Sequence, residues 1–283
     1  MIIQIASDLH LEFAQNRKYL YENPIIPNTP KGDILILAGD IIPLHKVHEI
    51  SPFFNLWEKQ FKSVFWVPGN HEFYNNSIDL TKPSYEKRYF EKTELLQNRR
   101  KDVIFNGTSK NTVKEGIFIF STLWSNIPPD RAGLIQRRIS DYHVISISNE
   151  ETGKNNRINQ YTKREMFTVE QSNELFRQSL QFLEHSLDKI KKDSKDNSGL
   201  VVVTHHLPVL QCIYPKWRGS DLWNAFASDL DYLVRKHPVD LWIFGHQHEP
   251  MDFTYADTRF VSNPLGYASE GFSTFQQDFC IEL

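Results

Sequence analysis

The sequence has very little cysteine: Cys212 and Cys280 are the only two among its 283 residues. They are far apart in the chain and fit neither a disulfide framework nor a C-x-x-C site. We therefore interpret both as reduced thiols. A reducing cytoplasm is the location that this cysteine usage predicts.

An excess of charge of one sign is also missing, since the formal net charge is −3. A DNA-binding module or a polybasic membrane patch would need a basic field, so neither is expected, although a nuclease site would not need net positive charge. No hydrophobic run approaches the ~18 residues of a transmembrane helix. The opening "MIIQIASDLH" lacks a basic region and turns polar after a few residues, which indicates a strand and no signal peptide. No membrane association is predicted.

What the sequence does contain is an ordinary globular composition, with 40% hydrophobic and 24% charged residues. Near-continuous runs of valine, isoleucine and leucine recur, as in sheets that are buried on both faces. Five such runs end in polar residues: 1–8, 33–40, 63–70, 199–206 and 239–246. Two later runs, 258–264 and 278–283, indicate further strands. The pattern predicts an α/β fold.

One segment has clear helical spacing. Its apolar residues step by four and three along one face, at Phe176, Leu180, Leu183, Leu187 and Ile190. Thr168 and Gln171 have the spacing of a capping box, which predicts the start of this helix.

The sequence shows no internal repeat and no convincing domain boundary. We therefore predict a single domain over residues 1–283. It contains one long insertion at about 125–160, which has no clean period and begins "SNIPPDRAG". Loops of this length are often functional or disordered.

The polar residues at the ends of the five runs are all oxygen or nitrogen donors that divalent first-row metals accept. They are Asp8, His10, Asp40, Asn70, His205, His246 and His248. In open α/β sheets, ligand sites collect at the carboxyl ends of the strands, so we expect these side chains to converge. Any one of these residues alone would be a weak signal, but five such strand ends in one chain predict a metal site.

With these motifs the chain resembles the calcineurin-like metallophosphoesterases. That family has the pattern D-x-H, G-D, G-N-H-[DE], a histidine and G-H-x-H, which is matched in order by "DLH", "GD", "GNHE", "THH" and "GHQH". The resemblance spans Asp8 to His248, which is nearly the whole chain. It implies a four-layer α/β/β/α sandwich, in which two mixed sheets are flanked by helices and a binuclear metal centre lies along one edge.

The resemblance also implies a role for each matching residue. One metal would be held by Asp8, His10, Asp40 and His248, and the other by Asp40, Asn70, His205 and His246. Asp40 would bridge the two, which offsets the repulsion between cations ~3.5–4 Å apart. Either histidine of the "THH" motif could bind from sequence alone, and the family pattern favours the first over His206. His71 would face the substrate as the catalytic group. Glu72 has no direct metal contact in the family pattern, and we interpret it as a residue that supports a ligand or as a structural one.

The function that follows is the metal-dependent hydrolysis of a phosphoester. Two divalent ions, such as Mn, Fe or Zn, would lower the pKa of a shared water so that hydroxide attacks phosphorus, and protonated His71 would donate to the leaving alkoxide. No G-x-x-x-x-G-K-[ST] phosphate loop is present. A phosphatase acting on a small molecule is the first interpretation. A phosphodiesterase acting on a cyclic nucleotide or nucleic acid is the alternative, and a non-catalytic scaffold of the same fold is the more distant one.

One absence narrows this choice. Phosphoprotein phosphatases of the superfamily carry an aspartate–arginine pair shortly after G-D, but here the sequence continues "GDIIPLHK". A Ser/Thr protein phosphatase is therefore not expected. The sequence names no partner that would orient His71.

Several other residues have weaker signals. Arg137, Arg138, Asp141 and Tyr142 could line a phosphate-binding rim or form a solvated loop. Trp124 and Tyr267 could flank the cleft or belong to the core. The histidines outside the motifs are expected to be solvated or capping residues; these are His45, His48, His143, His185 and His237.

Overall fold

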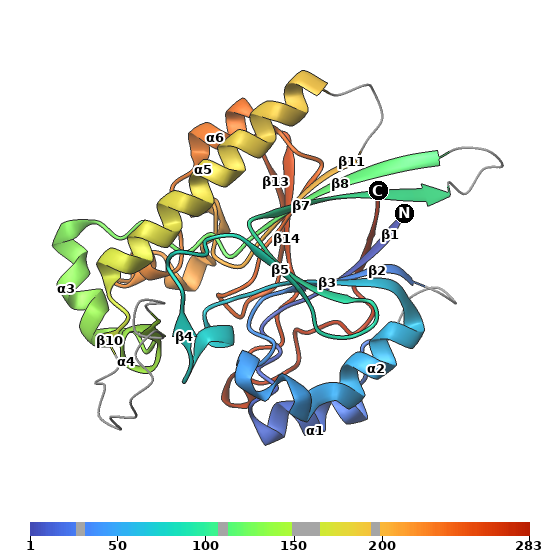
Figure 1. Ribbon diagram of the computed structural model, residues 1–283, viewed down its shortest axis with the longest axis horizontal. Helices are drawn as coiled ribbons and strands as arrows, with labels where there is room; N and C mark the ends of the chain where they lie inside the picture. The colour runs from blue at the N-terminus through green and yellow to red at the C-terminus, as the bar shows by residue number, and fades with distance from the viewer. Residues whose placement is uncertain (27–31, 107–112, 149–164, 194–198) are drawn as a thin grey trace, which may run out of the picture.

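Two six-stranded sheets lie face to face in the protein (Figure 1). The structure is a computed structural model that describes residues 1–26, 32–106, 113–148, 165–193 and 199–283. The first sheet has the strand order β15-β1-β2-β3-β6-β5. Its strands are β1 (Ile2–Ala6), β2 (Gly32–Ala38), β3 (Phe61–Val67), β5 (Tyr85–Arg88), β6 (Thr93–Gln97) and β15 (Cys280–Glu282).

The second sheet has the order β13-β14-β12-β11-β8-β7. Its strands are β7 (Arg99–Asn106), β8 (Val113–Ser121), β11 (Gly199–Thr204), β12 (Leu241–Ile243), β13 (Met251–Tyr255) and β14 (Thr258–Ser262). In both sheets the central strands are parallel and each edge strand is antiparallel to its neighbour. A small third sheet joins β4 (Ser77–Ile78), β9 (Ser146–Ile147) and β10 (Glu165–Met166).

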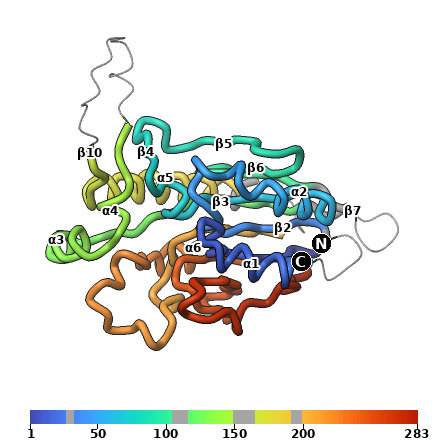
Figure 2. The backbone as a smooth tube through the Cα atoms, turned by 90° about the horizontal axis from the view of Figure 1, so that it is seen from below, coloured from blue at the N-terminus to red at the C-terminus, as the bar shows by residue number. Residues whose placement is uncertain are grey.

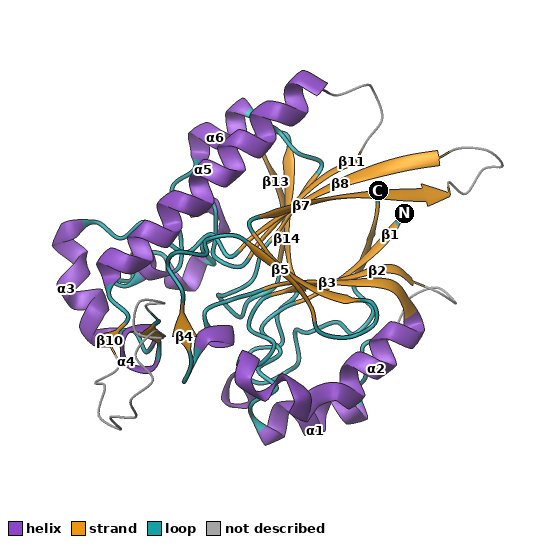
Figure 3. Cartoon of the chain, in the orientation of Figure 1, coloured by secondary structure: helices purple, strands orange, loops and turns teal. Residues whose placement is uncertain are grey.

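Helices cover the outer face of each large sheet (Figure 3). On the first sheet these are α1 (Ala14–Glu22) and α2 (Ser51–Gln60), and on the second they are α5 (Val169–Asp193) and α6 (Asp231–Lys236). The predicted capping box starts α5: the Thr168 backbone N–H donates to Gln171 Oε1 at 2.9 Å, and the Gln171 N–H donates to Thr168 Oγ1 at 3.3 Å. No α-helix in the described ranges is both long and apolar enough to cross a membrane.

Three buried clusters lie between these four layers. One lies between the sheets and includes Ile36, Phe65, Phe120 and Val203. The other two pack the helices against the outer faces of the sheets, with α2 over the first sheet and α5 over the second. This layering confirms the predicted α/β/β/α sandwich. The central strands are apolar on both faces because each sheet is covered on both sides.

The segment predicted as an insertion contains regular structure. Its first part forms α3 (Pro129–Arg138), α4 (Asp141–Val144) and β9. Sequence periodicity does not detect α3 because Ile135 is its only buried residue, so it has no apolar stripe. Residues 149–160 of the predicted insertion lie outside the described part of the chain. The interpretation of residues 1–283 as one domain stays a prediction.

Short 3₁₀ helices complete the chain. They are η1 (Leu44–Ile50), η2 (His71–Phe73), η4 (Leu210–Cys212), η5 (Pro215–Trp217), η6 (Trp223–Ala225) and η7 (Ala268–Glu270). Figure 2 shows α3 and α4 at the same end of the molecule as the orange segment that follows β11, although the two are far apart in sequence. The two termini lie side by side, since β1 pairs with β15.

Candidate metal centre

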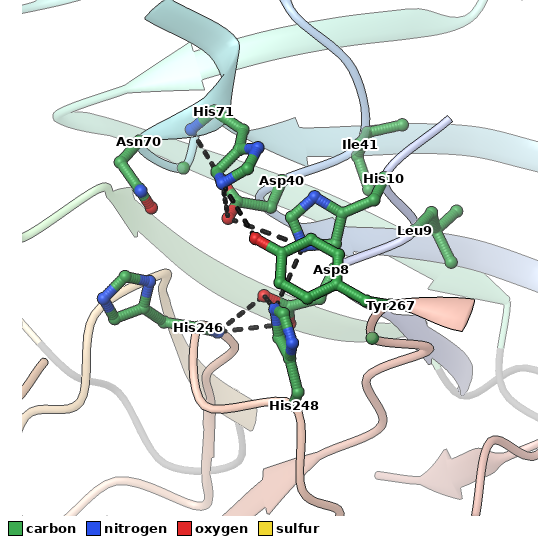
Figure 4. Close-up of polar contacts among 12 residues, drawn as sticks. Asp8, Leu9, His10, Asp40, Ile41, Asn70, His71, His246, His248 and Tyr267 are labelled. Atoms are coloured by element: carbon green, nitrogen blue, oxygen red, sulfur yellow. Dashed lines mark hydrogen bonds and ion pairs between the residues drawn. The ribbon is translucent and has the colours of Figure 1, made fainter. Parts of the chain in front are cut away.

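Parallel strands of both sheets bring the predicted ligands together. β1, β2 and β3 are neighbours in one sheet, and β11 and β12 are neighbours in the other. Each of the five is followed by one or two of the predicted residues, so all seven lie at the same end of the sandwich. Figure 4 shows side chains of this set turned toward a common centre, with Asp40 and Asp8 between the imidazoles. The two sheets each contribute part of the site.

The backbone at these positions is unusual. Five of the seven residues have a positive φ, in the left-handed region that few non-glycine residues occupy. They are Asp8 (52°), His10 (46°), Asp40 (56°), His246 (75°) and His248 (56°). Such conformations cost of order 1–3 kcal/mol each and cluster at functional sites, where the surrounding structure holds them in place.

The glycines of the motifs allow the strand ends to approach one another. A Cβ atom at Gly39, which has φ +88°, would overlap the His205 ring. A Cβ atom at Gly69 would overlap the Asp40 carboxylate. Glycine therefore precedes Asp40 and Asn70 because the backbone itself contacts the side chains of the site.

The first group of metal-ligand atoms comes from Asp8, His10 and His248. His10 Nε2 lies 3.0 Å from His248 Nε2, which lies 3.7 Å from Asp8 Oδ1. The other ring nitrogen of each histidine contacts a carboxylate: His248 Nδ1 lies 2.7 Å from Glu270 Oε2, and His10 Nδ1 lies 3.3 Å from Glu12 Oε1. Carboxylates behind the imidazoles fix the tautomer that presents a lone pair to the centre.

The second group comes from Asp40, His205 and His246. His205 Nε2 lies 3.4 Å from Asp40 Oδ2 and 3.1 Å from His246 Nδ1. Its Nδ1 lies 2.9 Å from the Ala38 carbonyl oxygen and donates to it, which leaves Nε2 as the ring nitrogen that faces Asp40 and His246. Burial alone would lower the pKa of His205, but the Asp40 carboxylate outweighs it and raises the pKa to about 10. The surroundings of His205 Nε2 therefore favour a positive charge, which either a bound proton or a metal cation could supply.

Asn70 turns its amide oxygen toward the same point, with Oδ1 3.1 Å from His205 Nε2. Its amide nitrogen donates to Asp141 Oδ1 at 2.9 Å, and the Tyr74 hydroxyl donates to the same oxygen at 2.8 Å. Asp141 begins α4 and is buried. One of the residues weighed as a phosphate-binding rim thus contacts Asn70 and also lines the cavity.

Asp40 lies between these two groups, and it forms a third group of possible metal ligands with His10 and His71. Its Oδ2 atom is 4.0 Å from His10 Nε2 and 3.4 Å from His205 Nε2. Its Oδ1 atom accepts a hydrogen bond from the His71 backbone N–H at 2.8 Å. Burial would raise the pKa of Asp40, but the charges of His205 and His71 hold it well below its ordinary value. The ionised carboxylate thus faces histidines of both groups.

His71 has a different set of contacts. Its Nδ1 lies 2.9 Å from Glu12 Oε1 and its Nε2 lies 3.2 Å from the Tyr267 hydroxyl, while its ring stacks on Tyr74 at 3.9 Å. Burial would lower the pKa of His71, but the carboxylates of Asp40 and Glu12 raise it to about 9. Glu12 is the orienting partner that the sequence did not name.

Glu72 is fully buried. Its carboxylate accepts hydrogen bonds from the backbone N–H groups of Gly69, Asp40 and Ile41 at 2.7, 3.0 and 2.8 Å, and from Trp66 Nε1 at 3.0 Å. It therefore ties the turn after β2 to the turn after β3, which is the structural role expected for it.

Of the two histidines in "THH", the first turns toward the centre. His206 is buried behind it, where its Nδ1 lies 3.2 Å from the Thr122 carbonyl oxygen and its ring packs against His246 at 4.2 Å. Burial and the neighbouring His205 lower the pKa of His206 to about 3, so it is neutral.

The residues with weaker sequence signals lie in different parts of the structure. Arg138 lines the cavity beside the centre, as does Tyr267, whereas Tyr142 and Trp124 are core residues. His45, His48 and His143 are exposed, and His237 is buried and lies 3.1 Å from Asp188. Among the described residues, the groups of possible metal ligands include none of these histidines.

A cavity of about 360 Å³ opens onto this cluster. Asp40, Asn70 and His71 line one end of it, together with Tyr267. Residues of the segment between β11 and α6 form much of the rest, and α3 contributes Arg138. A bound molecule could thus reach the ligand cluster and His71 at the same time.

These residues fit a pair of divalent cations. Carboxylate and amide oxygens and imidazole nitrogens converge, and their outer atoms are held by hydrogen bonds to Glu270, Ala38 and Asp141. This combination of donors suits first-row divalent metals. The cluster could therefore hold metal ions.

Sequence reasoning missed Glu12 and Glu270. Glu12 had a signal, because it follows His10 by two residues in "DLHLE" and thus leaves the same strand. Glu270 had none: it is 22 residues from His248 in sequence and reaches it through the fold.

Comparison with known proteins agrees with this geometry. Residues 1–250 match the family described as calcineurin-like phosphoesterase. The chain is 30% identical over 291 residues to "Uncharacterized protein L509" of Acanthamoeba polyphaga mimivirus, with 95% of this chain and 92% of that protein covered. It is 22% identical over 277 residues to "[Acyl-carrier-protein] phosphodiesterase PptH" of Mycobacterium tuberculosis, covering 93% of this chain and 77% of that protein.

A solved structure has a similar fold. The crystal structure of phosphopantetheinyl hydrolase (PptH) from Mycobacterium tuberculosis superimposes with a TM-score of 0.65 at 16% identity, covering 99% of this chain and 95% of that one. At this identity the likeness shows the fold alone. The family match, the sandwich and the cluster of carboxylates and histidines agree, and the chain belongs to the calcineurin-like phosphoesterases, a family of metal-dependent phosphoester hydrolases.

Proposed function

We propose that the protein hydrolyses phosphodiesters of small organic groups with two divalent cations. The observation that carries the proposal is the charge of the cavity beside the ligand cluster. Among the described residues, Arg138 is the only arginine or lysine that lines it, and Arg138 is exposed at its edge. A diester brings one negative charge, whereas the dianion of a monoester brings two and gains more from cationic donors in the cavity. The lining therefore favours the diester.

The ligand roles are part of this proposal. Asp8, His10 and His248 would hold one cation and Asn70, His205 and His246 the other, with Asp40 shared by both. When bound, two such cations supply Lewis acidity to water and to phosphoryl oxygens. Mn²⁺, Fe and Zn²⁺ all accept these donors.

His71 would donate a proton to the departing oxygen. Its Nδ1 contact with the Glu12 carboxylate leaves Nε2 as the atom that faces the cavity. The raised pKa of His71 favours the protonated form that a general acid needs. This role matters most where the leaving group is a poor one, such as an alkoxide.

Two further observations bear on the choice between esters. The relative from Mycobacterium tuberculosis that is similar over 93% of this chain has a name that describes a phosphodiesterase, which supports the diester. Arg138 supports the second candidate, a phosphatase acting on a small phosphomonoester, because it could meet the extra charge.

The test compares two esters with one leaving group. Purified protein loaded with Mn²⁺ is assayed on methyl p-nitrophenyl phosphate and on p-nitrophenyl phosphate. We expect the larger kcat/KM on the diester. A larger value on the monoester would support the phosphatase instead, and no hydrolysis of either ester by metal-loaded protein would support a non-catalytic scaffold.

A further inference from the structure

One wall of the cavity is made of apolar and aromatic side chains from a single segment, 207–226. We call this segment the aromatic wall. It contains η4, η5 and η6, and its side chains that line the cavity are Leu207, Ile213, Trp217, Leu222, Trp223 and Phe226. The wall begins next to the ligand cluster, since the Phe226 ring packs against His246 at 4.7 Å. It therefore lies where the part of a substrate beyond the phosphate would go.

The backbone of the aromatic wall is held in place. The Leu207 N–H donates to the Phe226 carbonyl oxygen at 3.0 Å and closes the segment into a loop. The Tyr214 N–H donates to Gln247 Oε1 at 2.8 Å, which attaches the middle of the loop to the turn that carries His246 and His248. The apolar surface is thus fixed relative to the ligands and needs no ordering when a substrate binds.

One large side chain of the wall is left open to solvent. Trp217 is 47% exposed although it lines the cavity. An exposed tryptophan at the mouth of a cavity is a favourable surface for an apolar or aromatic group, because contact would remove its ring from water.

The charges around the cavity do not suit a polyanion. Near the wall, Lys216 is paired with Glu249 and Arg131 with Asp221 at 3.0 Å, whereas Arg218 donates to the Ile213 carbonyl oxygen at 3.2 Å. The carboxylates of Asp141 and Glu270 also line the cavity. A nucleic acid strand needs a groove with a positive potential along its backbone, whereas Arg138 is the only arginine or lysine among the described residues that line this cavity.

We infer that the aromatic wall binds the second ester substituent of the phosphodiester, and that this substituent is an uncharged, mainly apolar group. This rests on the proposed function, because the phosphate must lie at the ligand cluster for the substituent to reach the wall. A volume of about 360 Å³ is enough for one such arm. Oligonucleotides and polyphosphates are excluded from the substrate class by the same reasoning.

The test uses diesters with one leaving group and different second substituents. Methyl, hexyl and thymidine-5′ p-nitrophenyl phosphates are compared on the Mn²⁺-loaded protein. A single methylene in a fitting apolar pocket contributes ~10-fold or more, so kcat/KM for the hexyl ester should exceed that for the methyl ester by at least ~10-fold, mainly through KM. The thymidine ester should be no better than the methyl ester. Equal values for hexyl and methyl, or a preference for thymidine, would overturn the inference.

Substitutions of single aromatic residues test whether the aromatic wall causes the preference for the hexyl ester. Trp217→Ala should lower the hexyl-to-methyl ratio several-fold, and Trp217→Phe, which keeps an aromatic ring, should retain most of it. Tyr232→Ala is the matched control, because Tyr232 is similarly exposed (49%) but lies on α6 and does not line the cavity. It should leave the ratio unchanged. An unchanged ratio in folded Trp217→Ala would contradict the assignment of the wall.

A second readout separates this inference from the proposed function. The affinities of hexylphosphonate and methylphosphonate for the metal-loaded protein are measured by calorimetry, without any turnover. If no diester is hydrolysed but hexylphosphonate binds at least ~10-fold more tightly, the diester proposal fails and the aromatic wall stands. If diesters are hydrolysed but the two phosphonates bind equally, the wall assignment fails alone.

Discussion

Glu12 and His71 form a pair at the edge of the ligand cluster. One carboxylate oxygen of Glu12 contacts Nδ1 of both His71 and His10, at 2.9 and 3.3 Å. Burial would raise the pKa of Glu12, but its contacts with the two imidazoles lower it to about 2. An ionised carboxylate at this position fixes the tautomer and the ring orientation of His71.

Replacement of His71 tests its proposed role as a general acid. General acid catalysis contributes ~10²–10⁴-fold where the leaving group needs a proton. His71→Asn should therefore lower kcat/KM most on an alkyl ester and much less on a p-nitrophenyl ester, because p-nitrophenolate leaves without help. Metal content, measured on the same samples, should stay near that of the wild type. Equal losses on both esters, or a loss of metal, would assign His71 to the ligand set or to the turn.

Replacement of Glu12 tests the orientation of His71. Outer partners of this kind typically contribute ~10–100-fold in activity or metal affinity. Glu12→Gln should lower kcat on the alkyl ester by that amount with little change in KM, and Glu12→Gln with His71→Asn should be no worse than His71→Asn alone. Additive losses in the double variant would show that Glu12 acts independently of His71.

At the scale of elements, Glu72 holds two strand ends together. Its carboxylate accepts four hydrogen bonds from groups on both turns, and the residue is completely buried. Removal of the carboxylate would leave these donors buried without an acceptor, at ~1–3 kcal/mol for each group that stays unsatisfied. The turns that present Asp40 and Asn70 would then lose their common anchor.

Glu72→Ala should therefore lower the free energy of unfolding by at least ~3 kcal/mol, since several buried donors are affected. Denaturant unfolding measures this change. Glu22→Ala is the control: Glu22 is an exposed residue of α1 whose contact with Lys18 is 3.9 Å, and pairs of that kind contribute ~0–1 kcal/mol. A loss at Glu72 no larger than that at Glu22 would contradict the anchoring role.

Much of the fold could be predicted from the sequence because the signals are local. The apolar runs that become β1, β2, β3 and β11 are strands for which burial on both faces leaves little alternative. α5 has both a periodic apolar face and a capping box, so its start and its packing face were readable. The ligand residues were readable because each follows a strand within five positions.

The parts of the fold and of the site that the sequence did not predict depend on contacts between residues that are far apart in the chain. α3 has a single buried residue and therefore no stripe, and Glu270 meets His248 only because η7 folds back over the site. Asp141 was one polar residue among several in a segment without periodicity, and its contact with Asn70 spans 71 positions. Nothing near these residues in the sequence indicates their partners.

At the scale of the whole molecule, the site is divided between the two sheets. Asp8, Asp40 and Asn70 follow strands of the first sheet, while His205 and His246 follow strands of the second. A cation held between them would bind both halves of the sandwich. Metal loading should therefore stabilise the protein as a whole, because a ligand that binds only the folded chain shifts unfolding by mass action.

If Asp40 is shared by both cations, replacing Asp40 and replacing Asp8 should reduce metal binding differently. Asp40→Asn should weaken both metal sites, because Asp40 Oδ2 faces His10 and His205 alike. Asp8→Asn should weaken mainly one, because Asp8 belongs to a single group with His10 and His248. Isothermal titration of each metal-free variant with Mn²⁺ resolves the two sites. The same single-site loss in both variants would count against the bridge.

A count of bound metal ions against activity tests the proposed metal-dependent hydrolysis most directly. Protein freed of metal by chelation is titrated with Mn²⁺, and bound metal per chain and hydrolysis of methyl p-nitrophenyl phosphate are measured on the same samples. We expect no hydrolysis in the metal-free protein and two ions per chain at saturation, with activity that follows their binding. Undiminished hydrolysis by the metal-free protein, or the failure of any divalent metal to bind, would contradict this expectation.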